Sequence, residues 1–250
     1  MNACAIVPAA GRGVRMGEGI PKQFLEISGT PILVRTLQVL RRTAFVRELI
    51  LVAPSDYVEE TELLLGRFGL PRYQKSLADE KPPELCLSIV KGGAERQESV
   101  LNALKSMSST CPYVLIHDGV RPFVSVRLLE DTWKAAISYG AAIAALPATD
   151  TVKRVCNHKV LETLSREKIW LVQTPQVFRR EVIMEAYGAA RKHGWTGTDD
   201  AALVERIGHP VAVVMGERSN IKVTTPEDLR WAEWFIGDQS VSGTREQGRT

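Results

Sequence analysis

The sequence predicts an α/β fold, in which helices cover both faces of a mostly parallel β-sheet. Apolar runs that are typical of strands alternate with helical patterns along most of the 250 residues. These runs are apolar at every position, whereas a strand with one wet face would alternate with polar residues. Apolar residues make up 44% of the chain and charged residues 24%, which is typical of a globular protein. We therefore expect a single domain over residues 1–236.

Predicted strands and helices alternate from the N-terminus to residue 146. The strands are expected at residues 3–7, 49–52, 89–90, 113–116 and 141–146. The first helix is predicted to begin with Thr30 as its N-cap and Pro31 as its first residue. Further helices are expected at residues 57–68, around the apolar residues Val100, Leu101, Leu104 and Met107, and at residues 125–139. This order is Rossmann-like, and such sheets bind ligands at the carboxyl ends of their strands.

Residues 149–178 interrupt the alternation of strands and helices. Segments 151–155, 160–165 and 170–173 have the pattern of half-exposed strands. We interpret residues 149–178 as a β-arm that projects from the core, and such arms often pack against a second subunit. A local surface sheet is the alternative interpretation.

The regular pattern resumes after the arm. A helix is predicted at residues 180–193, a second helix after Thr198-Asp199, and a strand at residues 211–215. A last helix is predicted to begin at Thr225-Pro226, with a threonine N-cap and a proline in the first position. Residues 237–250 are polar and rich in Gly, Ser, Thr and Arg, so we expect a flexible C-terminal tail.

Composition argues against several classes of partner. The net charge of +3 gives no basic stripe for nucleic acid. No apolar run approaches the ~18 residues that span a membrane, and the N-terminus does not look like a signal peptide, so we expect a cytoplasmic protein. The cysteines have no metal-binding spacing and are interpreted as small apolar residues: Cys4, Cys86, Cys111 and Cys156.

The loop after the first predicted strand has the features of a phosphate-binding site. Its glycines allow backbone N–H groups to approach an anion closely, and Arg12, Arg15 and Lys22 add positive charge. The Gly-Lys-Ser/Thr signature of a P-loop is absent. The dinucleotide fingerprint would need glycine where Met16 stands. The remaining interpretation is a site for a nucleotide triphosphate, with a solvated basic turn as the structural alternative.

The loop and later motifs resemble one family of nucleotidyltransferases. The matching segments are Pro8-Ala9-Ala10-Gly11-x-Gly13-x-x-Met16-Gly17, Pro21 to Leu25, Gly92 to Val100, His117 to Phe123, Asp150 to Arg154, Ser165-Arg166, Gln173 to Gln176, Thr198 to Asp200 and Asn220 to Thr224. In this order they are similar to the 2-C-methyl-D-erythritol 4-phosphate cytidylyltransferases of the non-mevalonate isoprenoid pathway. The resemblance implies transfer of CMP from CTP to the polyol phosphate, with release of pyrophosphate.

The resemblance also implies roles for individual residues. The catalytic cations would be Arg15, Lys22 and Lys222. CTP would contact Pro8, Ala9, Ala10, Gly11, Gly13, Gly93, Ala94, Arg96, Ser99, Asp118 and Gly119. The polyol phosphate would contact Arg121, Thr151, Arg166 and Lys222. Asp118 would help to hold Mg²⁺, and Arg12 would be a surface charge. A homodimer is implied, in which the β-arm carries Thr151 and Arg166 to the other subunit.

Two alternatives remain open from the sequence. A ribitol-5-phosphate cytidylyltransferase has a similar loop, although that loop typically begins Leu-Ala-Gly-Gly where this chain has Pro8-Ala9-Ala10-Gly11. A non-catalytic nucleotide-binding regulator could share the fold, but it would lack the cations and the acidic metal ligand. One departure concerns Ser219, which stands where some family members carry an acid, so a metal contact from that position is not implied.

Overall fold

The computed structural model describes residues 1–11, 21–70, 85–108 and 110–246. Its centre is a seven-stranded sheet made of β1 (Ala3–Pro8), β4 (Val46–Ala53), β5 (Cys86–Lys91), β6 (Tyr113–Ile116), β7 (Ala141–Pro147), β10 (Trp170–Arg179) and β11 (Ala212–Met215). The strand order is β11-β7-β10-β6-β1-β4-β5. Only β10 runs antiparallel to its neighbours within this sheet. The predicted α/β fold with a mostly parallel sheet is therefore confirmed.

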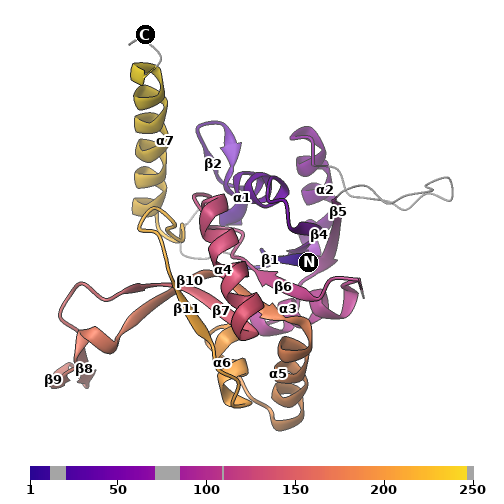
Figure 1. Ribbon diagram of the computed structural model, residues 1–250. Helices are drawn as coiled ribbons and strands as arrows, with labels where there is room; N and C mark the ends of the chain where they lie inside the picture. The colour runs from indigo at the N-terminus through magenta and orange to yellow at the C-terminus, as the bar shows by residue number, and fades with distance from the viewer. Residues whose placement is uncertain (12–20, 71–84, 109, 247–250) are drawn as a thin grey trace.

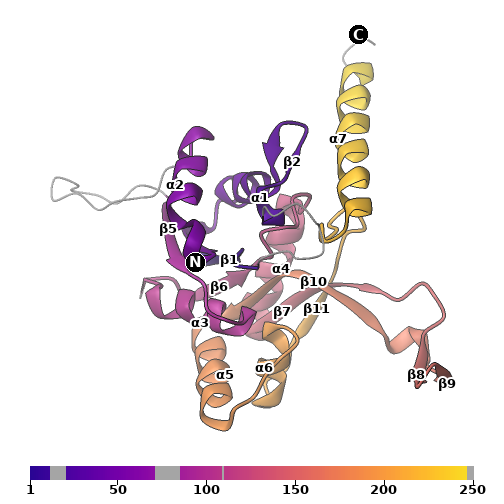
Figure 2. The ribbon, with the colours of Figure 1, turned by 180° about the vertical axis from the view of Figure 1, so that it is seen from behind.

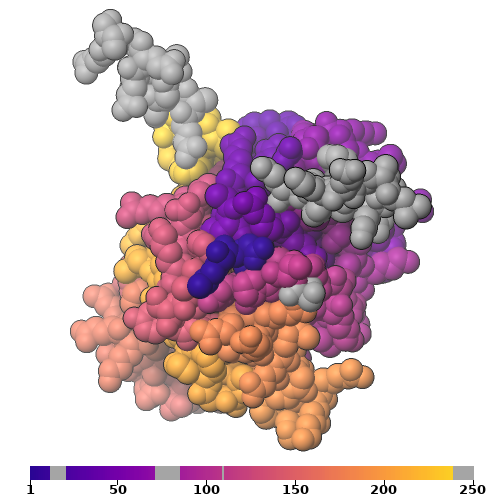
Figure 3. Space-filling model, turned by 45° about the vertical axis from the view of Figure 1, so that its right-hand side comes forward, coloured from indigo at the N-terminus to yellow at the C-terminus, as the bar shows by residue number. Residues whose placement is uncertain are grey.

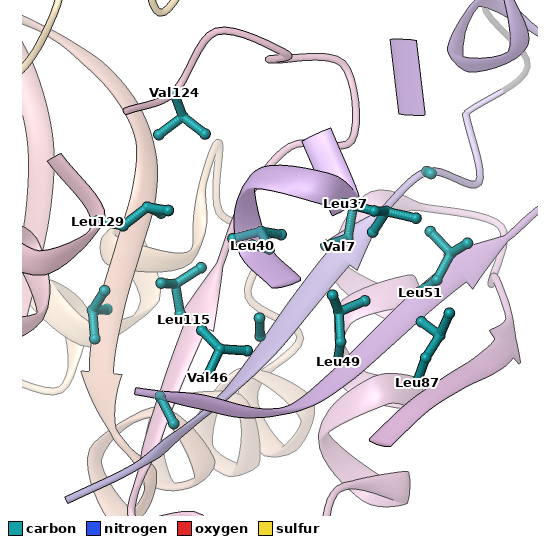
Figure 4. Close-up of a cluster of buried hydrophobic side chains, with 14 of the residues drawn as sticks. Val7, Leu37, Leu40, Val46, Leu49, Leu51, Leu87, Leu115, Val124 and Leu129 are labelled. Atoms are coloured by element: carbon teal, nitrogen blue, oxygen red, sulfur yellow. The ribbon is translucent and has the colours of Figure 1, made fainter. Parts of the chain in front are cut away.

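Helices cover both faces of the sheet. One face packs against α1 (Ile32–Arg41), α2 (Val58–Arg67) and α4 (Val126–Tyr139). The other packs against α3 (Arg96–Ser106), α5 (Arg180–His193) and α6 (Asp200–Arg206). In β1, Ala5 and Val7 point to the first core, whereas Cys4 and Ile6 point to the second. Burial on both faces explains why β1 is apolar at every position, and Figure 4 shows the first of these cores.

The beginning of α1 differs from the prediction. Thr30 and Pro31 form the short strand β3 (Thr30–Pro31), which pairs with β2 (Glu26–Ile27), and the helix starts at Ile32. The prediction of Thr30 as an N-cap was wrong, because this residue lies in a small hairpin with extended backbone. The prediction for the last helix was correct, since the Thr225 hydroxyl accepts a hydrogen bond from the Asp228 N–H at 3.2 Å.

A β-hairpin projects from the body, as expected. It consists of β8 (Lys153–Cys156) and β9 (Lys159–Thr163), and all of their residues are exposed. Figures 1 and 2 show it standing away from the main sheet. The predicted arm of residues 149–178 was too long, however, because β10 joins the main sheet and buries Val177 and Phe178. An antiparallel strand needs no crossover helix, so β10 broke the alternation without leaving the core.

The C-terminal helix α7 (Pro226–Glu246) extends beyond residue 236. Its first turns pack on a small third core that contains Val120, Val223 and Ala232. Figure 1 shows the rest of the helix standing out from the body. In the view of Figure 3, the purple and magenta surface of the first half of the chain lies above the orange surface of the later residues. Residues 237–246 are therefore helical, where a flexible tail was expected. The flexibility of the C-terminal tail stays a prediction.

Candidate active site

A cavity lies where the loops after β1, β5 and β6 meet. It is lined by Pro8, Ala9, Ala10, Gly11, Lys22, Gln23, Gly93, Ala94, Glu95, Arg96, Ser99, Asp118, Val120 and Lys222. The three strands are parallel, so their carboxyl ends reach the same edge of the sheet, where open α/β sheets bind ligands. Most residues predicted to bind a nucleotide come together here. Gly13 and Arg15 lie outside the described residues, as does Arg12, and Gly119 is adjacent to the lining residues.

The first residues of the loop after β1, Ala9 and Ala10, are closely packed. The buried Gln23 donates its side-chain N–H to the Ala9 carbonyl at 2.6 Å, from the short 3-10 helix η2 (Lys22–Phe24). A Cβ on Gly92 would lie only 2.3 Å from the Cβ of Ala10. Only glycine leaves room at position 92, and its small size allows the loops after β1 and β5 to approach each other closely. The sequence prediction gave Gln23 no role, although it stands in a matching motif.

The turn before α3 presents its backbone to the same cavity. The Gly93 N–H donates to the Ser99 hydroxyl at 3.0 Å, and the Ala94 N–H donates to the Glu98 carboxylate at 2.7 Å. Both acceptors lie in the first turn of α3. These contacts give a defined shape to the turn, which lines the cavity with Gly93 and Ala94. Glu98 is a second residue that sequence reasoning did not select.

Asp118 is surrounded by cations at the centre of the site. Its carboxylate lies 3.1 Å from the Lys222 ammonium, 3.3 Å from the Arg121 guanidinium and 3.8 Å from that of Arg96. Burial raises the pKa of Asp118, but these three cations outweigh it and hold the pKa below its ordinary value. The carboxylate is therefore ionised at neutral pH.

A buried network behind Asp118 positions its neighbours. The Thr174 hydroxyl accepts from the Asp118 N–H at 3.0 Å and contacts His117 Nδ1 at 3.1 Å. The Asn220 side-chain amide donates to the Thr174 backbone carbonyl at 2.8 Å, and the Asn220 backbone carbonyl accepts from the Arg121 guanidinium at 2.8 Å. These bonds tie β10 to the loop that carries Lys222. Thr174 and Asn220 were visible only as parts of motifs, because their partners lie far away in the sequence.

A second cavity adjoins the first and shares three of its charged residues. It is lined by Arg96, Asp118, Arg121, Val172, Gln173, Thr174, Gln176, Thr198, Asp199 and Lys222. Arg96, Asp118 and Lys222 line both cavities. The two remaining substrate-binding predictions, Thr151 and Arg166, line neither cavity. Arg166 instead donates to the Thr149 carbonyl at 2.7 Å on the exposed surface.

Two joined cavities rich in cations, at the carboxyl edge of such a sheet, define an α/β enzyme of the nucleotidyltransferase class. Comparison with known proteins identifies the family. The family model for IspD, 2-C-methyl-D-erythritol 4-phosphate cytidylyltransferase, matches residues 3–238. The chain therefore belongs to this family, and its activity is that of a cytidylyltransferase of the non-mevalonate isoprenoid pathway. The family resemblance seen in the motifs is confirmed.

Individual relatives support the assignment over nearly the full length. The 2-C-methyl-D-erythritol 4-phosphate cytidylyltransferase of Geobacillus kaustophilus is 48% identical, covering 96% of this chain and 99% of the relative. That of Syntrophus aciditrophicus is 46% identical, covering 98% and 97%. The crystal structure of 4-diphosphocytidyl-2C-methyl-D-erythritol synthase from Anaerococcus prevotii has a TM-score of 0.79 at 32% identity, covering 94% and 96%. Within the described part of the chain, no helix has the length and apolar character that a membrane crossing requires.

Proposed function

We propose that the two joined cavities bind CTP and 2-C-methyl-D-erythritol 4-phosphate side by side. The observation that carries this proposal is the wall that the cavities share, formed by Arg96, Asp118 and Lys222. The triphosphate occupies the first cavity and the polyol phosphate the second. A phosphate oxygen of the polyol phosphate attacks the α-phosphorus of CTP, the bond to the β-phosphate breaks, and pyrophosphate leaves.

The first cavity supplies backbone groups for the nucleotide. The residues from Pro8 to Gly11 hold the phosphates together with Gly13, and the turn at Gly93 and Ala94 recognises cytosine with the help of Ser99. Close packing supports this geometry, because small residues at Ala9 and Ala10 let the chain approach the ligand. Arg96, Asp118 and Gly119 complete the nucleotide contacts.

The chemistry calls for cations more than for a general base. The attacking phosphate oxygen is already an anion at neutral pH, so no residue has to remove a proton. The barrier comes from repulsion between two anions and from charge that builds up at phosphorus, which fixed cations offset. Lys22 and Lys222 line the first cavity, and we assign them this role together with Arg15.

Mg²⁺ is the divalent metal that we propose for this reaction. The described residues contain no group of three or more metal-ligating side chains. Mg²⁺, however, is commonly held by one or two carboxylates together with substrate phosphates. The ionised Asp118 faces the cavity and fits that pattern, so Asp118 and the CTP phosphates would hold the ion, which would neutralise developing charge.

Two of the residues proposed to bind the polyol phosphate lie outside the second cavity of their own chain. Arg121 and Lys222 line it, whereas Thr151 and Arg166 lie on the projecting hairpin region outside it. We propose a homodimer in which the arm of each subunit brings Thr151 and Arg166 to the second cavity of the other. The exposed apolar residues on the hairpin β8–β9 support such packing: Val155, Val160 and Leu161.

Mixing two inactive variants tests the exchange of arms. Arg166→Ala and Lys222→Ala each remove activity from their own homodimer. In a mixed dimer, one site combines an intact Lys222 with an intact Arg166 from the other subunit, so an equimolar random mixture regains about a quarter of the native rate. A mixture that stays inactive after subunit exchange has been verified contradicts the shared site.

A direct assay tests the reaction itself. The purified protein is incubated with CTP, Mg²⁺ and either 2-C-methyl-D-erythritol 4-phosphate or ribitol 5-phosphate, and pyrophosphate release and the cytidylylated product are measured. We expect product with the methylerythritol phosphate and loss of turnover when EDTA removes the metal. Faster turnover with ribitol 5-phosphate would favour the alternative cytidylyltransferase. Full activity in EDTA would remove the metal from the mechanism.

A further inference from the structure

A buried carboxylate lies directly behind the wall between the two cavities. Asp200 is the first residue of α6 and is only 1% exposed. One of its oxygens accepts from the Arg96 guanidinium at 2.8 Å, and the other accepts from the Tyr187 hydroxyl at 2.5 Å. Asp200 lines neither cavity, so it does not reach the substrates itself. The proposed function gives this residue no role.

Arg96 is the group through which Asp200 reaches the site. It lines both cavities, and its guanidinium lies between two carboxylates, 2.8 Å from Asp200 and 3.8 Å from Asp118. Burial lowers the pKa of Arg96, but the two carboxylates reverse that effect and raise the pKa above its ordinary value. Because the contact with Asp200 is the shorter of the two, Asp200 fixes the position of the planar guanidinium.

We propose that Asp200 is a positioning residue, which holds Arg96 in the wall shared by the two cavities so that the guanidinium faces both substrates. This inference rests on the proposed function. Without the charge of Asp200, the remaining nearby anion for Arg96 is Asp118. A guanidinium paired with Asp118 would leave its place between the phosphates and would occupy the carboxylate that we assign to Mg²⁺.

The elements around Asp200 suit this role. Asp199, the preceding residue, caps α6 by accepting from the Ala202 N–H at 2.9 Å. Tyr187 lies on α5 and donates its hydroxyl to the second oxygen, so both oxygens accept hydrogen bonds from groups on other elements. The carboxylate thus has one orientation, which is what a positioning residue needs.

A double-mutant cycle tests the proposal. Asp200→Asn, Arg96→Gln and the combined variant are compared with the native enzyme, by kcat/KM for each substrate and by Tm. We expect Asp200→Asn to lower kcat/KM about tenfold for both substrates in the native background, and less than twofold in the Arg96→Gln background. A residue that acts only on stability would lower Tm and give independent, multiplicative effects in the two backgrounds. That result would overturn the proposal.

Two further variants keep the test decisive. If Asp200→Asn does not fold, Tyr187→Phe loosens Asp200 while its charge stays, and its smaller effect of about threefold should likewise disappear in the Arg96→Gln background. Multiplicative effects would again count against the proposal. Asp131→Asn makes the same chemical change on the exposed face of α4, and its kinetics should stay native. If the native enzyme transfers no CMP to the methylerythritol phosphate, the proposed function fails instead, so the two failures are distinguishable.

Discussion

Replacing Gly92 by alanine should damage the nucleotide site through a single methyl group. The added Cβ would lie 2.3 Å from the Cβ of Ala10, 3.2 Å from the Ser99 hydroxyl and 3.3 Å from the Ala53 carbonyl. Carbon atoms in ordinary contact are about 3.5–4.0 Å apart. The methyl pair must therefore separate by about 1.2 Å or more. Ser99 and Ala53 block the movement of Gly92, so the displacement falls on Ala10 and on the loop that faces the phosphates.

The size of the effect follows from that displacement. Overpacking of this kind costs about 1–3 kcal/mol, which lowers the Tm of a domain of this size by about 2–12 °C. A shift of about 1 Å in a group that positions the reactants costs about 10²-fold in rate. We therefore expect kcat/KM for CTP to fall about 10²-fold, measured at a temperature where the variant is folded.

Gly188→Ala is the matched control for this prediction. Gly188 lies in α5, and a Cβ there meets nothing within 4 Å. The same substitution should therefore leave kcat/KM unchanged, and it should stabilise the helix by about 0.5–1 kcal/mol. If Gly92→Ala kept both the native Tm and kcat/KM within about twofold, the close approach of the two loops would not matter for the site.

Three more predictions concern charge in the site. Lys222→Ala removes the cation 3.1 Å from Asp118 and should lower kcat by about 10²–10³-fold in a folded protein, so near-native turnover would disprove its role. Burial lowers the pKa of His117 to about 4, so an unfolded chain binds an extra proton below pH 6.5. The contribution of His117 to the free energy of unfolding should fall by roughly 2 kcal/mol from pH 6.5 to pH 5. When urea unfolding is measured at each pH, the free energy of unfolding of His117→Gln should depend less steeply on pH than that of the native protein. An equal dependence on pH would contradict the assignment. Arg166→Lys replaces a planar fork by a point charge and should raise KM for the polyol phosphate more than for CTP, which equal changes in both KM values would refute.

Local patterns in the sequence were sufficient for most of the fold. The strands β1, β4 and β6 are apolar on both faces, so their runs are unambiguous. The pattern was insufficient for β10, whose first residues are exposed while Gln176 and Phe178 are buried. That strand changes environment along its length, and only its partners β6 and β7 show that it belongs to the core.

The candidate site also has one part that the sequence predicted and another that it did not. The loops after β1, β5 and β6 were predicted from motifs, because parallel strands bring their carboxyl ends to one edge. The residues behind those loops were not predicted. Asp200 meets Arg96 from 104 positions away, and Asn220 meets Thr174 from 46 positions away. Such pairs depend on how helices, strands and loops far apart in the sequence pack together, which no local spacing records.

The described lining residues leave much of the charge of the proposed substrates uncompensated. Among the residues that the structure describes, four cations and three acids line the two cavities, a net charge of +1: Lys22, Arg96, Arg121 and Lys222 against Glu95, Asp118 and Asp199. A triphosphate carries about −4 and a phosphate monoester about −2 at neutral pH. The difference is large, and charges other than those of the described lining residues would reduce it. Mg²⁺, Arg15 and an Arg166 from a second subunit would together add +4, so each of the three proposals about metal, loop and arm answers the same electrostatic requirement.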